Sequence, residues 1–305
     1  MLDVARLRVL VAVARHGSVT AAARALHYAQ PSVSHHLARL EAETGSRLVQ
    51  RVGRGIRLTE AGRVLADRAE EILGRLDAAE QELAAHTGLR AGRVRLAAFP
   101  SALGTFVPVA AAGFNHPGVE LSFREAEPPE AVDLLRRGEV DVAVLFAHDG
   151  GPDLAGLRAE ELFEDETCLV TPLDWAGDRL ADHAERRWIG GCERCRAELL
   201  RACAAEGFTP DIRFTTDDYV AAQQLVASGL GVTTLPALAL AGHRNANVRV
   251  VPLPGRARRI SVAVAGEPPD PPATRALVER IRASSPRPPG AAPAHRSSAG
   301  PATRP

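Results

Sequence analysis

The sequence predicts an α/β protein in three parts: a winged helix-turn-helix unit, a long linker helix and a domain of two α/β lobes. Residues 1–58 give short helical patterns followed by an arginine-rich hairpin pattern. Residues 59–88 carry apolar side chains at heptad spacing, which is typical of one long helix. From residue 91 to residue 283, strand and helix patterns alternate, which predicts parallel sheets covered on both faces.

Composition places the chain among globular proteins, because 46% of its residues are hydrophobic and 24% are charged. It contains no apolar run of about 18 residues, so we expect no membrane span. The N-terminus has no basic segment followed by an apolar block, so we expect no secretory signal and a cytoplasmic location. Residues 284–305 are mainly Pro, Ala, Arg, Ser and Gly, and this tail is expected to be disordered.

The net charge is zero, but it is distributed unevenly. Residues 1–60 hold nine arginines against four acidic residues, whereas residues 91–283 are net acidic. A basic N-terminal block on a neutral chain indicates a polyanionic partner for that block alone.

The N-terminal helical patterns follow the helix-turn-helix plan. Residues 4–15 form an apolar stripe, and Gly17 can end this helix in a left-handed cap. Ser18 is placed to cap the next helix, and residues 27–29 are a tight connection to a third helix over residues 30–43. In this plan the second helix of the motif enters the major groove of DNA.

The third helix is predicted to have a core face and a DNA face. Val33, Leu37 and Leu40 share one side of a 3.6-residue period. The opposite side is mostly small, neutral or basic, and has no acidic residue before Glu41, which suits contact with phosphates and base edges. An ordinary amphipathic surface helix would show the same pattern, so the neighbouring segments decide between the two.

A basic hairpin is predicted directly after this helix. Two short apolar runs flank a glycine-rich tip at residues 52–55, and Arg51, Arg54 and Arg57 line the hairpin. Beside a recognition helix, such a wing can reach phosphates or the minor groove. The alternative is a solvated surface hairpin.

A heptad pattern follows Thr59, which is expected to cap the linker helix. The seam positions are Leu65, Ala69, Ile72, Leu76, Ala79 and Leu83. A seam sustained over about three heptads favours a partner helix, and therefore dimerisation. The alternative is a helix packed on its own domain. Residues 86–92 are predicted to form a breaker and hinge.

The remaining segment predicts two α/β units with a cleft between them. The first has strands at 93–98, 119–123 and 140–146 and helices at 105–114 and 130–137. The second has strands at 166–171, 187–190, 212–216, 231–235 and 249–253 and helices at 196–207 and 218–229. A strand at 259–264 and a helix at 274–282 could return to the first unit. The predicted first lobe is 91–161 plus 265–283, and the second is 162–264. Ligands of such sheets bind beyond the carboxyl ends of strands.

Motifs for catalysis are missing from the sequence. Ser101, at a strand-to-helix turn, offers a hydroxyl and backbone N–H groups to an anion, or serves as a plain helix cap. Gly229-x-Gly231 lacks the third glycine and the acid of a dinucleotide site. Walker, nucleophile-elbow and zinc-protease motifs do not occur, so we expect neither a cofactor nor enzymatic activity.

The cysteines raise a redox or zinc hypothesis, because Cys192 and Cys195 form a Cys-x-x-Cys pair and Cys203 follows nearby. Only Cys168 completes the set of four, and no histidine lies near them in sequence. We therefore expect no metal site and take structural thiols as the default.

Residues 1–62 resemble the N-terminal domain of LysR-type transcriptional regulators. The matching signature comprises Gly17 to Leu26, Gln30 to Ser34, Leu40-Glu41, Leu48 to Arg51, Arg54, and Leu58 to Gly62. The linker helix, residues 207–210 and residues 229–232 also fit this family. The resemblance covers all but the tail.

The resemblance implies a winged helix-turn-helix on DNA, a linker coiled coil and an effector domain with a fold like that of periplasmic binding proteins. The residues that it places at the DNA are Gln30, Pro31, Ser34, Arg51 and Arg54. Those that it places near an effector are Ser101, Phe146, Cys192 and Thr216. His35 stands at a variable position and is a candidate for sequence choice, with a solvated histidine as the alternative. Ala29 departs from the usual Ser or Thr, so a helix cap and phosphate contact is missing.

The predicted function is a sequence-specific DNA-binding transcriptional regulator, modulated by a small molecule in the inter-lobe cleft. The expected partners are promoter or operator DNA, an anionic effector, further copies of the chain in a homodimer or homotetramer, and RNA polymerase if the protein is an activator. One alternative is a thiol-based redox regulator that uses Cys192, Cys195 and Cys203. Another is a solute-binding protein or enzyme built on the two lobes, which would need a secretion signal or a catalytic set.

Overall fold

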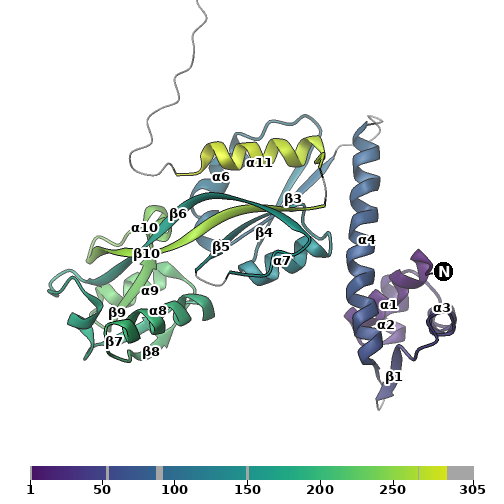
Figure 1. The fold of residues 1–305 in the computed structure, drawn as a ribbon, viewed down its shortest axis with the longest axis horizontal. Helices are drawn as coiled ribbons and strands as arrows, with labels where there is room; N and C mark the ends of the chain where they lie inside the picture. Colours follow the sequence, from purple (N-terminus) through teal and green to yellow (C-terminus); the bar gives the residue numbers. More distant parts are fainter. Residues whose placement is uncertain (1, 53–54, 87–91, 149–150, 267, 287–305) are drawn as a thin grey trace, which may run out of the picture.

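The computed structural model describes residues 2–52, 55–86, 92–148, 151–266 and 268–286. It shows a helical N-terminal unit, a long helix and a two-lobed α/β domain, in the predicted order (Figure 1). Arg54 of the predicted wing, residues 87–91 of the predicted hinge and residues 287–305 of the predicted tail lie outside the described residues. No helix among the described residues is long and apolar enough to span a membrane.

The N-terminal unit consists of α1 (Val4–His16), α2 (Val19–Ala25), α3 (Gln30–Thr44) and a hairpin of β1 (Val49–Val52) and β2 (Gly55–Leu58). Its helices begin and end where the capping residues predict. Gly17 adopts a φ of 61° after α1, and the Ser18 side chain accepts a hydrogen bond from the backbone N–H of Ala21. Ala29 gives α3 no side-chain cap, so Pro31 in the first turn is its local start signal.

The core face of α3 is confirmed, since Val33, Leu37 and Leu40 are buried against α1 and α2. The first turns of α4 (Glu60–His86) belong to the same core. Thr59 caps α4 by accepting the N–H of Gly62 at 3.0 Å. A Cβ on Gly62 would lie 2.0 Å from the carbonyl oxygen of Leu48, so only glycine allows the helix to pass this close to the wing.

The predicted heptad seam of α4 divides into two parts. Its first part packs inside the chain, because Ala69 is fully buried and Leu65 is partly buried against the N-terminal core. The later seam positions face solvent at Ile72, Ala79 and Leu83, with Leu76 half-buried. The exposed fraction reaches 67% at Leu83. Packing within the N-terminal unit therefore accounts for the first part of the seam, whereas the later part is largely exposed.

One mixed sheet of eight strands runs through both lobes in the order β4-β3-β5-β10-β6-β9-β7-β8. The strands are β3 (Arg93–Ala98), β4 (Glu120–Glu125), β5 (Val142–Ala147), β6 (Leu157–Pro172), β7 (Arg187–Gly190), β8 (Asp211–Thr215), β9 (Val232–Pro236) and β10 (Val248–Ala265). The helices are α5 (Pro100–Leu103), α6 (Phe106–Ala112), α7 (Pro128–Arg136), η1 (Leu180–His183), α8 (Glu193–Ala205), α9 (Tyr219–Ala227), α10 (Ala237–Gly242) and α11 (Pro272–Ser284).

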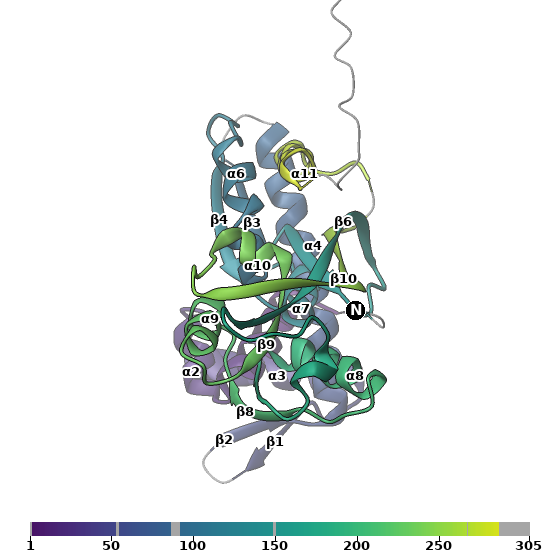
Figure 2. The same ribbon diagram turned by 90° about the vertical axis from the view of Figure 1, so that its left-hand side faces the viewer.

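The parallel pairing predicted within each lobe is confirmed: β3 is parallel to β4 and β5, and β7 is parallel to β8 and β9. The prediction is wrong for the strands that join the lobes. Strands β6 and β10 are antiparallel to each other, β10 is antiparallel to β5, and β6 is antiparallel to β9. Figures 1 and 2 show these two long strands side by side across the domain.

The two long strands also correct the predicted strand limits. Strand β6 begins at Leu157 instead of residue 166, and β10 is one strand where the sequence predicted two. The register of β10 against β6 shifts between Pro252 and Ala257. This irregular segment contains Pro254 and Gly255, and β10 continues on both sides of it. Residues 259–263 pair with β5, as expected for a strand that returns to the first lobe. The residues predicted to separate the two lobes stay a prediction.

Helices cover both faces of the sheet in each lobe. In the first lobe, α6 and α11 pack on one face and α7 packs on the other. In the second lobe, α9 and α8 take the two faces in the same way. The residues that follow the carboxyl ends of β3 and β7 lie at the boundary between the lobes. Ligands of such sheets bind at this edge.

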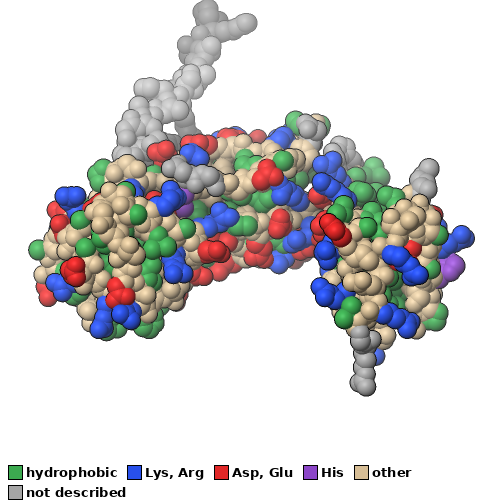
Figure 3. All heavy atoms as spheres, turned by 60° about the horizontal axis from the view of Figure 1, so that its bottom comes forward, with side chains coloured by type: hydrophobic (Ala, Val, Ile, Leu, Met, Phe, Trp, Pro, Cys, Tyr) green, Lys and Arg blue, Asp and Glu red, His purple; other side chains and the backbone are tan. Residues whose placement is uncertain are grey.

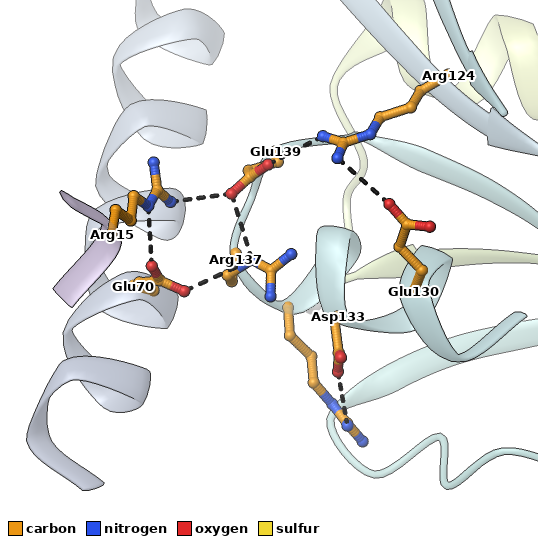
Figure 4. Close-up of polar contacts among 8 residues, drawn as sticks. Arg15, Glu70, Arg124, Glu130, Asp133, Arg137 and Glu139 are labelled. Atoms are coloured by element: carbon orange, nitrogen blue, oxygen red, sulfur yellow. Dashed lines mark hydrogen bonds and ion pairs between the residues drawn. The ribbon is translucent and has the colours of Figure 1, made fainter. Parts of the chain in front are cut away.

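Helix α4 touches the first lobe through glycine backbone and ion pairs. A Cβ on Gly74 would lie 2.4 Å from the carbonyl oxygen of Arg137, at the turn that follows α7. Beside this contact, Figure 4 shows a chain of charges from both sides. Glu70 of α4 pairs with Arg15 of α1 at 3.0 Å and with Arg137 at 3.5 Å, and Arg15 pairs with Glu139 at 2.9 Å. We call this set of contacts the linker junction.

Candidate DNA interface and effector cleft

The outer face of α3 is open to solvent, as a DNA-reading helix requires. The four positions predicted on this helix, Gln30, Pro31, Ser34 and His35, are all exposed. No acidic side chain stands on the described helix before Glu41. Figure 3 shows basic side chains spread over the N-terminal unit, with a histidine at its outer edge. A face with this charge and so little bulk suits contact with a phosphate backbone.

The wing is positioned by a contact that the sequence did not reveal. Arg51 and Arg57 are exposed on the hairpin. The carboxylate of Glu41, near the end of α3, accepts the backbone N–H groups of Leu48 at 2.8 Å and Val49 at 3.2 Å. This double contact fixes the hairpin relative to α3. In the sequence, Glu41 is the first acidic residue of the helix and part of the LysR signature. A contact between a helix and a following strand leaves no local pattern, so its role at the wing was not predicted.

The four predicted effector residues come together between the lobes. Ser101, Phe146, Cys192 and Thr216 all line one cavity, although they come from four separate segments of the chain. The cavity has a volume of about 40 Å³. Typical ligand pockets are roughly ten times larger, so the lobes must separate for a molecule of ordinary size to enter. We call this space the inter-lobe cavity.

Arg258 lines the inter-lobe cavity, and its role there was not predicted from the sequence. Its guanidinium is buried, donates to Asp165 at 2.9 Å and 2.8 Å and to the hydroxyl of Ser101 at 2.7 Å. It also lies 4.4 Å from the ring centroid of Phe146 and 4.9 Å from that of Phe99, which is cation–π geometry. Its burial could have been predicted from its spacing in the strand. Arg258 is two residues before the buried Ile260 and therefore lies on the same face of β10.

Two further groups at the inter-lobe cavity have shifted protonation. Burial, with a smaller effect of nearby Cys192, raises the pKa of Glu127 from its ordinary 4.5 to about 7. Burial also raises the pKa of Tyr219. The hydroxyl of Thr216 accepts the backbone N–H of Asp218 at 3.2 Å, which stabilises the loop before α9. The cavity therefore contains a carboxyl that changes charge near neutral pH.

The four cysteines differ in their burial and in their surroundings. Among the described residues, no group of three or more His, Cys, Asp or Glu side chains could hold a metal ion. All four cysteines are free thiols, and Cys168 and Cys203 are buried. The sequence expectation of core thiols is met by these two, whereas Cys192 and Cys195 face the inter-lobe cavity.

Two family models match the chain. One, described as a bacterial regulatory helix-turn-helix protein of the lysR family, matches residues 4–63, and the other, described as the LysR substrate binding domain, matches residues 87–286. The chain belongs to the LysR family of transcriptional regulators. It is thus a DNA-binding regulator with an effector-binding domain, in a family of regulators and not of enzymes.

Named relatives of this LysR regulator come from several bacteria. The RuBisCO operon transcriptional regulator of Allochromatium vinosum is 31% identical over 241 residues, which cover 75% of this chain and 78% of that protein. A probable hydrogen peroxide-inducible genes activator of Streptomyces viridosporus is 30% identical over 86% of this chain and 88% of that protein.

Solved structures show the same fold. CbnR, a LysR family transcriptional regulator, superposes with a TM-score of 0.64 at 23% identity, covering 94% of this chain and all 100% of that one. Full-length CbnR in complex with its target DNA gives 0.63 at 23% identity, over 93% and 100%. A full-length OxyR variant from Pseudomonas aeruginosa gives 0.68 at 24% identity, over 92% and 95%. The arrangement of helix-turn-helix, linker helix and two lobes is therefore the LysR fold.

Proposed function

We propose that this LysR regulator binds promoter or operator DNA with α3 and the wing and responds to a small effector that enters the inter-lobe cavity. The observation that carries the proposal is the convergence of Ser101, Phe146, Cys192 and Thr216 on one cavity between the lobes. Opening of that cavity would change how the lobes are held, and a coupling of roughly 1–3 kcal/mol would suffice to regulate DNA binding. The cytoplasm is the proposed location.

The DNA contacts divide into two kinds. Gln30, Ser34 and His35 are exposed on α3 and are proposed to read base edges, with Pro31 beside them. Arg51 and Arg54 of the wing are proposed to contact phosphates. Base contacts set sequence preference, whereas phosphate contacts set affinity and its dependence on salt.

Selection of bound duplexes from a random pool separates these roles. Gln30→Ala is expected to change the selected motif. Arg51→Ala is expected to weaken binding to all duplexes and to lower the salt slope by about one contact. Arg213→Ala, an exposed arginine on β8 in the second lobe, is the matched control and should change neither. An unaltered motif for Gln30→Ala would count against the base-reading assignment.

Dimerisation is proposed through the exposed end of the heptad seam. Ile72, Ala79 and Leu83 expose apolar surface on α4 that a second α4 could cover. Sedimentation of Leu83→Glu should show a shift towards the monomer, whereas Arg68→Glu, an exposed position off the seam, should not. A homodimer or homotetramer, and contact with RNA polymerase if the protein activates transcription, remain proposals.

We expect an anionic effector to bind more tightly when the carboxyl of Glu127 is protonated. The guanidinium of Arg258 is already paired with Asp165, and Glu127 adds a carboxyl to the same cavity. Because the pKa of Glu127 is about 7, its repulsion of an anion disappears as the pH falls through neutrality. Affinity for an anionic effector should therefore rise on acidification, and Glu127→Gln should abolish that rise. Affinity that falls on acidification would contradict the anionic class.

A further inference from the structure

Tyr28 is a large aromatic residue in the turn between α2 and α3, and it is 44% exposed. The turn that carries it is fixed to α2 by two backbone hydrogen bonds. The N–H of Tyr28 donates to the carbonyl of Ala23 at 2.9 Å, and that of His27 donates to the carbonyl of Arg24 at 3.2 Å. His27 itself adopts a φ of 55°, in the left-handed region. The backbone of Tyr28 is therefore held in one place before α3.

The ring of Tyr28 is held as well. It stacks on the imidazole of His36, a residue of α3, with the ring centroids 5.9 Å apart and the planes at 26°. His35 meets the same imidazole edge-on, with centroids 6.3 Å apart. The phenol hydroxyl makes no hydrogen bond with the described part of the chain, so it is free to bind another molecule. A ring that is already ordered loses little conformational freedom on binding.

His36 lies on the flank of α3 opposite the wing. Glu41, which binds the wing, follows His36 by five residues. At about 100° per residue, the two side chains leave the helix on opposite sides of its buried stripe. Ser32 and Arg39 share the flank of His36, because they stand four residues before it and three after it. We call Tyr28, Ser32, His36 and Arg39 the turn flank.

The turn flank offers hydrogen-bond donors and a positive charge. Arg39 is exposed, and it forms no ion pair with the residues that the structure describes. The acidic residue in the same helical row, Glu43, is paired with Arg6 of α1. Hydroxyl, imidazole and guanidinium groups can all donate hydrogen bonds, and phosphate oxygens accept them. The chemistry of this surface therefore suits a phosphate backbone.

The turn flank is also open and correctly placed. Figure 1 shows α3 on the side of the N-terminal unit that faces away from the two lobes. The turn flank and the wing border the same outer face, which carries Gln30, Ser34 and His35. The major groove is about 12 Å wide, and a helix with its side chains is about as wide. When α3 lies in the groove, one DNA strand faces the wing and the other faces the turn flank.

We propose that the turn flank is a second backbone contact of this regulator, in which the hydroxyl of Tyr28 donates to a phosphate oxygen and Arg39 adds charge beside the same strand. His36 is a positioning residue, because its imidazole supports the ring of Tyr28. The inference rests on the proposed function, since it takes α3 as the DNA-reading helix. The contact sets affinity and the register of α3 on the duplex, and not base preference.

Tyr28→Phe tests the hydroxyl, because it keeps the ring on His36. The affinity of the full chain for a duplex selected from a random pool should fall about tenfold. The selected motif and the salt slope should not change, because a neutral hydroxyl releases no counterion. Arg39→Ala should instead lower the salt slope by about one contact. His243→Gln, exposed in the effector domain, is the control and should change neither quantity. Unchanged affinity of Tyr28→Phe, or an altered motif, would overturn the contact.

Duplexes with a single neutral methylphosphonate show where the hydroxyl binds. The wild type should lose affinity at one phosphate whose replacement costs Tyr28→Phe nothing more, because both changes remove the same contact. That phosphate should lie across the groove from the one that is silent in Arg51→Ala. A variant that is merely less stable would weaken binding to every duplex equally. Losses that add at every phosphate, or one phosphate shared with Arg51, exclude the assignment.

The positioning role of His36 has its own readout. His36→Phe keeps a flat ring against Tyr28 and should retain the wild-type affinity within about twofold. His36→Ala should weaken binding as much as Tyr28→Phe does, and the double variant should bind no more weakly than either single variant. Additive losses in the double variant would show that His36 does not act through Tyr28.

Failure of this inference differs from failure of the proposed function. If Gln30→Ala changes the motif and Arg51→Ala lowers the salt slope while Tyr28→Phe binds like the wild type, the turn flank alone is excluded. If the wild type selects no duplex, α3 is not a DNA-reading helix and both proposals are overturned.

Discussion

The linker junction and the inter-lobe cavity both hold parts of this regulator together by arginine–carboxylate pairs, but their surroundings are opposite. At the linker junction, Arg15 is about half exposed and pairs with Glu70 and Glu139. At the inter-lobe cavity, the side chains of Arg258 and Asp165 are 4% and 2% exposed. The lobes are also joined by two continuous strands, whereas the linker junction rests on one helix and a turn.

This difference indicates which ion pairs can separate when the protein changes conformation. Exposed ion pairs contribute about 0–1 kcal/mol each and are screened by salt. A buried pair that loses one partner leaves an uncompensated charge, which costs several kcal/mol. A coupling free energy of roughly 1–3 kcal/mol is therefore enough to break ion pairs at the linker junction. Opening of the inter-lobe cavity, in contrast, has to leave the buried pair of Arg258 and Asp165 intact.

The largest expected effect comes from breaking the buried pair. Asp165→Ala leaves the guanidinium of Arg258 without its carboxylate and removes the acceptor of the Leu238 N–H. We expect a loss of about 3–5 kcal/mol in the free energy of unfolding, measured by urea denaturation. The double variant Asp165→Leu with Arg258→Met should recover most of that loss. A single variant as stable as the wild type would contradict the contrast between the junctions.

A steric change at the linker junction should separate domains without unfolding them. Gly74→Ala places a methyl group 2.4 Å from a backbone oxygen of the first lobe, yet alanine favours the helix itself. We expect small-angle scattering to show a larger radius and urea denaturation to show no loss within the effector domain. Gly62→Ala, in the same helix, clashes with Leu48 inside the N-terminal unit and should lower the stability of that unit instead. Unchanged scattering for Gly74→Ala would show that the junction is absent in solution.

The inter-lobe cavity should also show a dependence of stability on pH. The pKa of Glu127 is raised from 4.5 to about 7, so the folded state binds its proton more tightly than the unfolded state. The contribution of Glu127 to stability is therefore largest below about pH 4.5 and declines as the pH rises to about 7. Because Cys192, Asp217 and Arg258 face the same group, the measured quantity is the difference between wild type and Glu127→Gln. That difference should decline over this window, and a flat difference would exclude the shift.

The smallest expected effect comes from removing one exposed arginine of the linker junction. Arg15→Ala removes contacts to Glu70 and Glu139 and should cost less than about 1 kcal/mol. The loss should shrink further as salt is added. Arg68→Ala, whose exposed pair with Glu71 lies within α4, is the matched control. A loss as large as that of Asp165→Ala would remove the distinction between the two junctions.

Local patterns were enough for the N-terminal unit. Capping by Gly17, Ser18 and Thr59 and the buried face of α3 follow from side-chain chemistry within a few residues of each other. The same is true of the parallel strand–helix–strand units, because their apolar residues repeat every 2 residues in strands and every 3.6 residues in helices. Ser101, Phe146, Cys192 and Thr216 were placed by resemblance, and the structure adds that they meet at one cavity.

Three features depended on contacts between distant segments. Strand β10 continues through Pro252 because β6 pairs with it on both sides of the register shift, which no local signal shows. Arg258 is buried because Asp165, 93 residues away, neutralises it. The heptad seam is divided because α1 covers the start of α4 but not its end.

Sequence patterns alone predicted the order of the parts, the helix-turn-helix and the family. These rest on short-range propensities and on a continuous motif. The pairing of charges, the burial of each cysteine and the contact between the lobes came from the three-dimensional fold. The reason is physical: burial and electrostatic partners shift the properties of a side chain, and both are supplied by residues that lie far away along the chain.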